Sequence, residues 1–568
     1  MPLDPITAQV IQNRLSGIVQ EMQTNIFRTG YSTIVRESQD ASCMILDANG
    51  DVVGEHVILP LHIAALPEVV RAIYKAYGDR IYPGDAFITN HPYISGVTHS
   101  IDMAVAVPVF VGERLLAFCT SIAHKSDLGG MVPGTGSGNA RELFQEGIQY
   151  PPVKFTDRGQ VIPEVEAILR ANSRTPDVIL GDIRGQVGTA RLGEERLLDM
   201  VTRYGLETVL DTFADLQDKT EKRVRRVVSG WKDGVFEAEA WVDNDGIQLD
   251  RPILYHVRIE KTGDRILFDF SESADQTLGP LNVRPPLVRG CCYYAMVAMI
   301  DPELANNGGL ARVVETRFRR GSVLDPVFPA PTNTYMASAT AVTEAVLQAM
   351  NGLIPKKKVA GMGGVGGMVI GGQRQDGSSY VQYELIGAAY GARSGKDGAS
   401  GVSVLLDNAK TAPIEVIETE FPARVRRFEL ITDSGGAGEY RGGLAARREY
   451  DILAPKAQLT LRGGKHTQQP FGADGGKPGR LGVCIINPGQ ENEQSLPSRF
   501  GGVALQKGDV LLIEKAGGGG LGLPKNRNWN ALVEDVLDGY VSFEAAVSDY
   551  GADPDSLREV LFDWTGGE

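Results

Sequence analysis

The spacing of apolar residues in the first part of the chain predicts helices interrupted by one hairpin. Asp4 and Pro5 precede a run in which apolar residues recur every three or four positions, which predicts a helix over residues 4–28. In ASCMILDANGDVVGEHV the apolar residues alternate around Asn49 and Gly50, the strongest short-range signal of a β-hairpin. Helical spacing returns in LPLHIAALPEVVRAIYKAY, and PGDAFITNHPYISG indicates a short strand that leads into a turn-rich loop.

The pattern changes from helical to alternating spacing near residue 234. Residues 189–231 have helical spacing over two or three segments, with a break near Gly205. From Gly234 onward, short alternating or apolar runs are separated by Gly, Asp and Asn turns, which predicts a largely antiparallel β region. Within this region, helical spacing recurs near residues 285–300 and 338–352.

These patterns together predict an α+β protein of mixed, multi-domain organisation. A chain of 568 residues can form more than one core, since single cores stop growing near about 250–300 residues. We expect a helix-rich N-terminal part, a β-rich and glycine-rich C-terminal part, and a terminal helical segment. The predicted domains are an N-terminal α/β domain, a central mixed β domain with helical insertions, a C-terminal β-rich domain and a helical tail, over residues 1–233, 234–400, 401–522 and 523–568.

Composition narrows the classes of function. The 71 acidic and 57 basic residues give a formal charge of −14 without any Lys/Arg block, which argues against binding to nucleic acid or to an anionic membrane. The N-terminus lacks the features of a secretion signal, and the longest apolar run is about half of the ~20 residues that a membrane-spanning helix requires. The five cysteines form no CxxC pair, which indicates buried, reduced thiols. We therefore expect a cytoplasmic protein.

Five of the seven histidines fall between residues 56 and 124, namely His56, His62, His91, His99 and His124. In THSID and AHKSD, His99 and His124 are each followed three residues later by an aspartate, Asp102 and Asp127. This spacing lets both side chains converge from one tight turn, and AHKSD also ends an apolar, strand-like run in which a polar group needs a partner. Asp40, in RESQDASC, can supply a further carboxylate.

Two imidazoles and two carboxylates form a ligand set of borderline hardness. Such a set suits Zn, Mn or Fe better than Ca or Mg, which prefer oxygen ligands alone. A metal with an open position lowers the pKa of a bound water toward ~7 or polarises a carbonyl group. Because H-x-x-D patterns also arise by chance, spacing alone leaves two interpretations open: one transition-metal site, with zinc foremost, or polar side chains packed in a core.

Several longer motifs occur in order along the chain. They are DPITAQVIQNRL, HVILPLHIAALPEVV, PGDAFITNHPY, GVTHSIDMAVAVPVF, AHKSDLGG, ELFQEGIQYPPVKF, GPLNVRPPLVRGCCYYAM, TAPIEVIETEFPARVRRFEL, DSGGAGEYRGGLAARREY and AGGGGLGLP. In these motifs the chain resembles the hydantoinase B/oxoprolinase family over essentially its whole length. That family includes one half of ATP-dependent hydantoinases, of 5-oxoprolinase and of caprolactamase, as well as subunits of acetone and acetophenone carboxylases.

The resemblance implies an enzyme that hydrolyses small cyclic amides together with a partner. The partner would be a hydantoinase-A-type subunit that binds ATP and Mg²⁺ and phosphorylates the substrate oxygen, in an assembly with two copies of each subunit. By resemblance to the metal-containing members, the metal ligands fall on Asp40, His99, Asp102 and His124. Asp127 would then lie beside the metal as a catalytic candidate.

Two positions beside the implied site depart from the family pattern. The family has N-D-P-Y where this chain has His91 between Asn90 and Pro92, and it often has a second histidine where this chain has Lys125. We therefore add His91 and Lys125 to Asp127 as candidates for a catalytic or substrate-selecting role.

An unstrained amide is a poor electrophile because resonance must be broken on attack, and phosphorylation of its oxygen relieves that problem. We expect the partner to form an imidate-like phosphate and this chain to direct metal-activated water at the activated carbon, which releases the ring-opened acid. Two alternatives remain. The chain could belong to a ketone carboxylase, in which a phosphorylated enolate attacks carbon dioxide or carboxyphosphate, or it could be a non-catalytic scaffold that completes the partner's site.

Glycine supplies 68 of the 568 residues, above the usual share of ~7%. The stretches GMGGVGGMVIGG, PGTGSG and GGGGLG could cradle phosphate through backbone N–H groups, yet no G-x-x-x-x-G-K-[ST] motif occurs. We expect these glycines to form turns and close backbone contacts. The alternative is that one such loop receives the phosphorylated intermediate, with Lys465 or Arg462 from LRGGKH as counter-charge.

Overall fold

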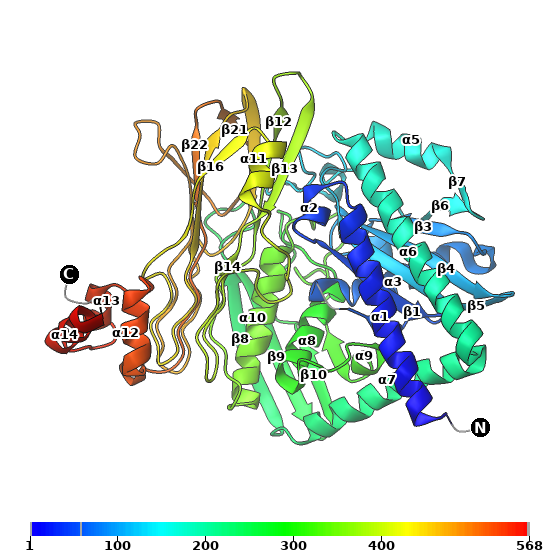
Figure 1. Cartoon of the computed structure of the whole chain (residues 1–568), viewed down its shortest axis with the longest axis horizontal. Coiled ribbons are helices and arrows are strands. Elements are labelled where there is room, and N and C mark those ends of the chain that lie inside the picture. The colour runs from blue at the N-terminus through cyan, green and yellow to red at the C-terminus, as the bar shows by residue number, and fades with distance from the viewer. Residues whose placement is uncertain (1–2, 57–58, 565–568) are drawn as a thin grey trace.

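The computed structural model of the chain describes residues 3–56 and 59–564 and is shown in Figure 1. In these residues one seven-stranded, two four-stranded, one five-stranded and one two-stranded sheet form the framework. Long helices cover the sheets of the first half of the chain, and a group of short helices ends it (Figure 1). The mixed arrangement of helices and sheets predicted from the sequence is confirmed.

The N-terminal sheet is antiparallel, with strand order β2-β1-β5-β4-β3-β6-β7. Its strands are β1 (Ala41–Asp47), β2 (Val52–Glu55), β3 (Ala86–Thr89), β4 (Asp102–Val111), β5 (Arg114–His124), β6 (Val153–Asp157) and β7 (Gln160–Val161). The predicted hairpin is confirmed, since β1 and β2 pair through a turn in which Gly50 has a φ of 82°. Central strands β4 and β5 are buried along most of their length, so polar residues on them need partners inside the protein.

Two long helices cover this sheet. Asp4 caps α1 (Pro5–Thr29) by accepting the N–H of Thr7 at 3.0 Å, as predicted, and α6 (Pro176–Tyr204) packs against α1, β4 and β5 (Figure 1). The predicted break at Gly205 separates α6 from α7 (Leu206–Ser229). However, α6 begins well before the predicted residue 189. Its early turns contain glycines that weaken the helical signal but permit contact: a Cβ at Gly181 would lie 2.4 Å from the ring of Tyr31.

The central part of the chain forms a four-stranded sheet covered by helices. Its strands β8 (Gly234–Val242), β9 (Ile253–Thr262) and β10 (Arg265–Asp269) pair antiparallel, and α10 (Met336–Leu353) packs on β8 and β9 beside α8 (Pro285–Ile300). Both predicted helical insertions are thus confirmed. Strand β11 (Val314–Arg317) departs from the predicted antiparallel pattern, because α8 carries the chain across the sheet and β11 pairs parallel with β10.

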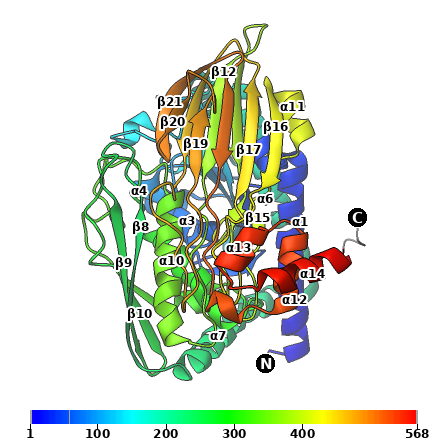
Figure 2. The ribbon, with the colours of Figure 1, turned by 90° about the vertical axis from the view of Figure 1, so that its left-hand side faces the viewer.

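Two antiparallel sheets pack together in the C-terminal part (Figure 2). One contains β12 (Gly367–Gln373), β13 (Ser379–Leu385), β18 (Lys456–Arg462) and β21 (Arg499–Gln506). The other contains β16 (Ala423–Leu430), β17 (Ala446–Ile452), β19 (Val483–Ile486), β20 (Gln494–Leu496) and β22 (Val510–Glu514), and β14 (Ala388–Ala389) pairs separately with β15 (Ser400–Val402). Buried apolar residues of both larger sheets, among them Ile370, Tyr450 and Leu459, form one cluster between them.

The glycine-rich segments pack backbone against backbone. The N–H of Gly519 donates to the carbonyl of Gly361 at 2.8 Å, although neither residue belongs to a sheet. A Cβ at Gly519 would lie 1.9 Å from the carbonyl oxygen of Phe471, and one at Gly517 would lie 1.8 Å from that of Ser434. These glycines therefore serve close backbone contact.

The chain ends in α12 (Trp529–Leu537), α13 (Phe543–Ser548) and α14 (Pro554–Trp564), which lie together at one side of the molecule (Figure 2). They surround a small apolar cluster that includes Ala437 of a glycine-rich segment. The largest apolar cluster contains residues from Ile11 to Ala409, so residues on both sides of the predicted boundary at residue 233 belong to one core. The predicted division into four domains stays a prediction.

The remaining helices are shorter than those that cover the sheets. They are α2 (Thr33–Arg36), α3 (Ala65–Tyr77), α4 (Pro92–Ser95), α5 (Pro163–Ala171), α9 (Gly308–Ala311) and α11 (Ile414–Glu420), with 3-10 turns at Pro60–His62, Gly78–Arg80, Leu143–Gln145 and Pro524–Asn526. Among them, α3 packs against β4, β5 and α8. Among the described helices, none combines the length and the apolar character needed to cross a membrane. All five cysteines are buried and unpaired, as predicted.

Candidate metal centre

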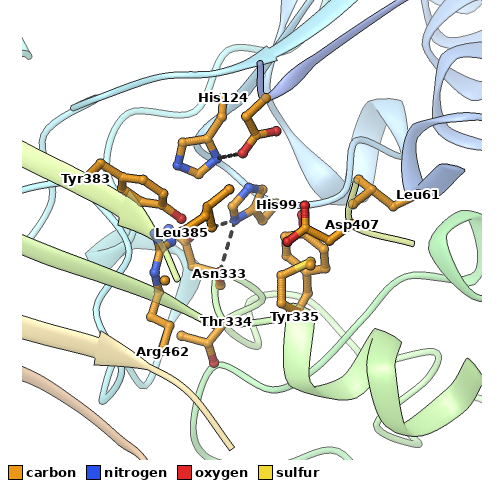
Figure 3. Close-up of a pocket in the computed structure, with 13 residues that line it drawn as sticks. Leu61, His99, His124, Asn333, Thr334, Tyr335, Tyr383, Leu385, Asp407 and Arg462 are labelled. Atoms are coloured by element: carbon orange, nitrogen blue, oxygen red, sulfur yellow. Dashed lines mark hydrogen bonds and ion pairs between the residues drawn. The ribbon is translucent and has the colours of Figure 1, made fainter. Parts of the chain in front are cut away.

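A small cavity lies where three parts of the chain meet (Figure 3). The first part contributes Asp40, Leu61, His99 and His124, the second contributes residues 333–336, and the third contributes Gly367, Tyr383, Leu385, Asp407 and Arg462. The cavity offers about 20 Å³ to the centres of water-sized groups, which is room for an ion or one to two waters.

Three predicted ligands lie at the ends of three neighbouring strands of the N-terminal sheet. Asp40 directly precedes β1, Asp102 begins β4 and His124 ends β5. The register pairs Asp102 with His124, and the N–H of His124 donates to the carbonyl of Asp40 at 3.1 Å. Antiparallel pairing therefore places side by side three residues that are distant in sequence.

A tight turn brings His99 to the same place. The N–H of Asp102 donates to the carbonyl of His99 at 3.2 Å, which closes a turn over residues 99–102. As a result, Nε2 of His99 lies 2.9 Å from Oδ1 of Asp102. This H-x-x-D pair converges as its spacing predicts.

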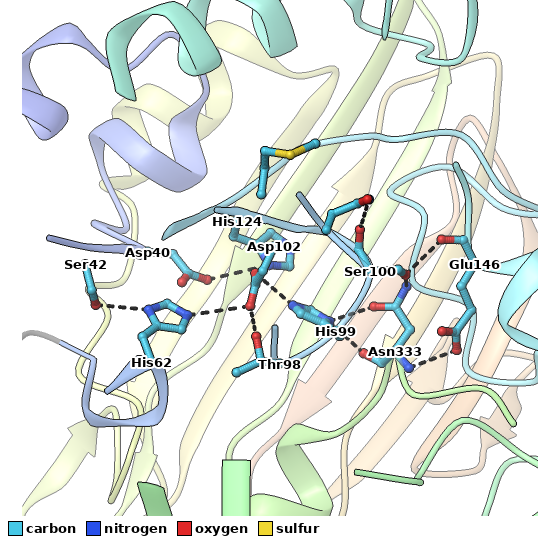
Figure 4. Close-up of polar contacts among 12 residues, drawn as sticks. Asp40, Ser42, His62, Thr98, His99, Ser100, Asp102, His124, Glu146 and Asn333 are labelled. Atoms are coloured by element: carbon cyan, nitrogen blue, oxygen red, sulfur yellow. Dashed lines mark hydrogen bonds and ion pairs between the residues drawn. The ribbon is translucent and has the colours of Figure 1, made fainter. Parts of the chain in front are cut away.

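The three side chains gather around Oδ1 of Asp102 (Figure 4). His99, Asp102 and His124 each offer one ligand atom, and these atoms lie within 4.8 Å of one another. Nδ1 of His124 is 3.1 Å from Oδ1 of Asp102 and 3.9 Å from Oδ2 of Asp40. The fourth predicted ligand thus borders the group at a slightly greater distance.

The protonation of His99 follows from its other contacts. Nδ1 lies 2.7 Å from Oδ1 and 3.0 Å from the backbone oxygen of Asn333, and both of these atoms are acceptors. The amide nitrogen of Asn333 faces Oγ of Ser100 at 3.2 Å, which fixes the orientation of that amide. The proton of neutral His99 therefore sits on Nδ1, and Nε2 carries a lone pair.

This lone pair points at a carboxylate. Nε2 of His99 is buried and makes no hydrogen bond of acceptable geometry with any described residue, although Oδ1 of Asp102 is 2.9 Å away. Two electron-rich atoms at this distance repel each other unless a cation or a proton is shared near them. Nε2 of His124 is also buried and has no hydrogen-bond partner in the described part of the chain. The donor set and these unpaired atoms fit a transition metal. In addition, the Nδ1–H group of His99 donates to Asn333, as the second ring nitrogen of a metal-ligating histidine usually does to a nearby acceptor.

Neighbouring polar groups fix the carboxylate of Asp102. Nε2 of His62 is 3.5 Å from Oδ2, and the hydroxyl of Thr98 donates to the same oxygen. His62 is itself held by Oγ of Ser42, 2.9 Å from Nδ1 (Figure 4). Because Oδ2 is occupied in this way, Oδ1 is left to face His99 and His124.

A buried glutamate supports Asn333 from the far side. Both oxygens of Glu146 accept the N–H of Thr332 at 3.0 Å, and one accepts the N–H of Asn333 at 2.8 Å. Burial raises the pKa of Glu146 to about 8, partly offset by these backbone hydrogen bonds. The segment that orients His99 is therefore anchored to the loop that follows β5.

The pKa values of the two carboxylates of the site are shifted in opposite directions. Burial works to raise the pKa of Asp102, but the imidazole groups of His99, His124 and His62 around its carboxylate outweigh burial, so the pKa lies well below the usual value. Burial, followed by the charges of Asp102 and Asp407, raises the pKa of Asp40 well above the usual value. Asp102 is thus the permanently ionised member, and Asp40 can hold a proton.

Burial also lowers the pKa of His124 to about 3, despite its hydrogen bond with Asp102. The ring is therefore neutral at physiological pH, the state in which imidazole binds metals. Its ring centroid lies 4.5 Å from that of Tyr383, and the ring of His99 lies 4.4 Å from that of Tyr335. Two tyrosines thus border the metal-type ligands on the cavity side.

Asp127 is placed away from this group and is fully engaged. Its oxygens accept the N–H groups of Gly129, Gly134 and Arg174 at 2.9–3.0 Å, together with the guanidinium of Arg174 at 2.9 Å. After His124 the chain bends at Ser126, and no backbone hydrogen bond closes residues 124–127 into a turn, so Asp127 reaches a different loop. The structure shows Asp127 holding the loop of residues 127–134, and its catalytic role stays a prediction.

Lys125 lies next to the cluster in the interior. Its Nζ donates to Oε1 of Gln186 at 2.6 Å, and burial lowers its pKa to about 8 against the opposing charges of Asp182, Asp102 and Asp40. Its amine can therefore exist in either protonation state near neutral pH.

His91 lies outside the cavity lining. It precedes α4, accepts the N–H of Tyr93 at 3.3 Å on Nδ1, and stacks with Phe328 at a centroid distance of 6.1 Å. Burial lowers its pKa. The catalytic roles of Lys125 and His91 likewise stay predictions.

Several residues of the site were not selected from the sequence. They are His62, Asn333, Tyr335, Tyr383 and Asp407. His62 belongs to the cluster of five histidines, and that crowding was its only signal. The others come from segments that carry no motif with a chemical meaning, and only the fold brings them to the cavity.

Known proteins resemble this chain along its whole length. It is 31% identical to a protein named as the B component of a D-/L-hydantoinase from Pseudomonas sp. (strain NS671), covering 99% of this chain and 97% of that one. It is 28% identical to the beta component of the caprolactamase of Pseudomonas jessenii, covering 97% and 96%. Against 5-oxoprolinase 1 of Arabidopsis thaliana, 25% identical, it covers 42% of that longer protein.

Solved structures share the fold. The structure of the ATP-dependent caprolactamase from Pseudomonas jessenii superimposes with a TM-score of 0.91 at 24% identity, covering 99% of both chains. A nucleotide-free acetone carboxylase gives 0.86 at 18% identity and covers 100% of this chain and 84% of the other. The model of the Hydantoinase B/oxoprolinase family matches residues 4–524, so this chain belongs to the hydantoinase B/oxoprolinase family.

Proposed function

We propose that this chain is the B-type component of an ATP-dependent cyclic-amide hydrolase and that His99, Asp102, His124 and Asp40 hold a transition metal. The observation that carries this proposal is the buried Nε2 of His99, which lies 2.9 Å from Oδ1 of Asp102 and has no hydrogen-bond partner among the described residues. Two imidazoles and two carboxylates favour zinc, with manganese or iron as alternatives. Relatives named hydantoinase, caprolactamase and 5-oxoprolinase support cyclic amides as the substrate class.

A separate A-type partner would bind ATP and Mg²⁺. Two relatives are named as the B and beta components of their enzymes, which implies a second component. An amide resists attack by water because its resonance must be broken, and phosphorylation of its oxygen relieves this. Water would add to the activated carbon, expulsion of the ring nitrogen would open the ring to an acyl phosphate, and hydrolysis of the acyl phosphate would release the acid and inorganic phosphate. The partner would form this phosphorylated species, and the present chain would hydrolyse it. Two copies of each component form the simplest closed assembly.

When bound, the metal would supply Lewis acidity and lower the pKa of a water. Asp102 stays ionised and is held by His62 and Thr98, so it fixes the positions of both histidines. Asp40 borders the cluster, and its carboxylate would complete the ligand set once it has lost the proton that its raised pKa favours. Asn333 keeps the proton of His99 on Nδ1.

The three predicted catalytic residues differ in their position relative to the cavity. Lys125 has a pKa of about 8 and feels the charges of Asp102 and Asp40, so we assign it a role in tuning the charge of the site. Asp127 and His91 lie outside the cavity lining in the described chain. Variants Asp127→Asn and His91→Asp test them directly through turnover in the assembled enzyme.

The cavity also sets a requirement for substrate entry. Its volume of about 20 Å³ admits an ion and water but not a five- to seven-membered ring. Tyr335 and Tyr383 border the ligands, so these side chains and their segments must move apart when a ring binds.

The test is turnover by the chain assembled with its A-type partner. Hydantoin, 5-oxoproline and caprolactam would be offered with ATP, and ring-opened acid and ADP would be measured. We expect one of these amides to be opened only with ATP and partner, with loss of activity after chelation and recovery with Zn²⁺, Mn²⁺ or Fe²⁺. Full ATP-dependent activity in a metal-free complex would contradict metal assistance, and normal turnover by His99→Ala would favour a scaffold.

The fold shared with acetone carboxylase makes ketone carboxylation the second candidate function. In such an enzyme a phosphorylated enolate would form a carbon–carbon bond, so turnover would require bicarbonate and a ketone. We expect no dependence on bicarbonate. Product formation from acetone or acetophenone that stops when bicarbonate is omitted would replace hydrolysis with carboxylation.

A further inference from the structure

Arg462 is a buried cation without an acceptor. It is the last residue of β18, and its side chain lines the cavity (Figure 3). Nε and Nη2 are buried and have no hydrogen-bond partner among residues 3–56 and 59–564. Unpaired buried charges are costly, and nearly all buried polar atoms in native proteins are bonded, so these two N–H groups call for a ligand.

Other buried cations nearby each have at least one acceptor in the protein itself, although Nε and Nη2 of Arg448 and Nε of Arg499 have no hydrogen-bond partner among the described residues. Nζ of Lys465 lies 2.6 Å from Glu344, and Nη1 of Arg448 lies 2.6 Å from Glu384. Arg499 donates to two backbone carbonyls at 2.5 and 2.9 Å. Of these four side chains, Arg462 is the one whose guanidinium is directed into a cavity without an acceptor.

The guanidinium of Arg462 is enclosed by an aromatic ring and by two glycines that leave room for it. It lies over the ring of Tyr383, 4.6 Å from the centroid. A Cβ at Gly136 would lie 2.3 Å from Nη1, and one at Gly367 would lie 3.5 Å from Nη2. Gly136 belongs to PGTGSG and Gly367 follows GMGGVG, so both glycine-rich stretches leave space that the guanidinium fills.

Tyr383 also links Arg462 to the metal-type ligands. Its ring contacts the guanidinium and the ring of His124, whose centroid is 4.5 Å away. The cation and the ligand cluster therefore share one cavity and lie within reach of a single small substrate.

We infer that Arg462 is the phosphoryl-binding residue of this site. The inference rests on the proposed function, because a phosphorylated amide carries its phosphoryl group one oxygen away from the carbon to be attacked. A guanidinium presents N–H groups in a planar fork that matches phosphate oxygens, and such charge-assisted bonds are among the strongest available. The ligand is thus a phosphate group, either on the activated substrate or as the inorganic phosphate released from it.

The first test measures binding of inorganic phosphate to the full chain by calorimetry and ³¹P NMR. Arg462→Gln should weaken phosphate binding at least about tenfold, and Arg462→Lys should weaken it less. Gly136→Ala is a second variant that keeps the charge: its backbone is outside the left-handed region, and its methyl group would displace the guanidinium. We expect the same weakening in this variant.

Arg480→Gln is the control for loss of one positive charge, because Arg480 is partly exposed and pairs with Glu514 away from the cavity. It should leave phosphate affinity unchanged. The inference is overturned if wild type binds no phosphate, if Arg462→Gln and Gly136→Ala bind it as wild type does, or if acetate binds as tightly as phosphate.

Phenyl phosphate distinguishes the two sources of the group. Binding of both phenyl phosphate and inorganic phosphate assigns the position to a phosphoryl group on substrate, whereas binding of inorganic phosphate alone assigns it to the released product. The inference and the proposed function fail separately. Arg462-independent phosphate binding with intact ATP-dependent hydrolysis overturns the former, and lack of any hydrolysis by the wild-type complex overturns the latter.

Discussion

The chain contains the H-x-x-D spacing twice within residues 99–127, and the two copies have different fates. His99 and Asp102 span a closed turn and approach to 2.9 Å. His124 ends a strand, and the chain then bends at Ser126 without a backbone hydrogen bond that closes residues 124–127, so Asp127 reaches a different loop. Equal spacing therefore has a chemical meaning only when a closed turn joins the two residues.

The two aspartates also show two uses of a buried carboxylate. Asp102 faces nitrogen atoms that can bind a metal, whereas Asp127 faces N–H groups and a guanidinium that already satisfy it. The first leaves coordination free, and the second is a structural anchor. Four predictions test this contrast, from the largest expected effect to the smallest.

Asp102→Asn should cause the largest change. It removes the charge around which His99 and His124 gather, so metal affinity should fall by more than about 100-fold. Metal content by elemental analysis and competition with a chromophoric chelator would measure it. Asp127→Asn is the matched control, and equal metal loss in both variants would refute the distinction between the two motifs.

Asp127→Ala should act on stability instead. It strands four donors, including the Arg174 guanidinium, so the free energy of unfolding should fall by about 2–4 kcal/mol while metal content is kept. Urea unfolding of metal-loaded and metal-free protein would show this. An unfolding free energy within error of wild type would mean that the 127–134 loop does not need this anchor.

Asn333→Ala should weaken metal binding by about 10- to 100-fold, because His99 loses a hydrogen-bond acceptor that fixes its tautomer. Ser100→Ala is the control, since it removes the partner of the Asn333 amide nitrogen but leaves the acceptor of His99. If the two variants bind metal equally well, orientation of His99 by Asn333 is unnecessary.

The smallest effect concerns pH in metal-free protein. The pKa of His124 falls from 6.5 to about 3 on folding, so between these values the unfolded chain binds a proton that the folded chain does not. This contribution to stability is complete above pH 6.5 and is lost as pH falls, at about 1.4 kcal/mol per pH unit.

Asp40, with its raised pKa, acts in the opposite sense, so the measurement is a difference between variants. Thermal unfolding from pH 7.5 to 5 should show a steeper loss in wild type than in His124→Gln. Identical pH slopes for the two proteins would mean that His124 is not buried in its neutral form.

Much of the fold could be predicted from spacing alone. The capped first helix, the Asn-Gly hairpin, the break at Gly205 and both helical insertions are local features, and local signals encode them. The parallel pairing of β11 was not predictable, because it depends on a crossover through α8 rather than on alternation.

The site was predictable only in part, for a related reason. His99, Asp102 and His124 stand out as polar residues in apolar strands or directly before one, whereas Asn333, Tyr383 and Arg462 come from distant segments. Asp127 shows the opposite difficulty, since its spacing equals that of Asp102 and only the hydrogen bonds of the folded chain separate the two.

The glycine-rich segments have a consequence for how the sequence can change. At Gly517 and Gly519, a Cβ would lie less than 2 Å from a carbonyl oxygen of a neighbouring segment. Even alanine cannot be accommodated there unless that backbone segment moves. In a saturation mutagenesis library, these positions should therefore be nearly as intolerant as the candidate metal ligands. A map of intolerant sites would thus outline a second region, far larger than the cavity, that performs no chemistry at all.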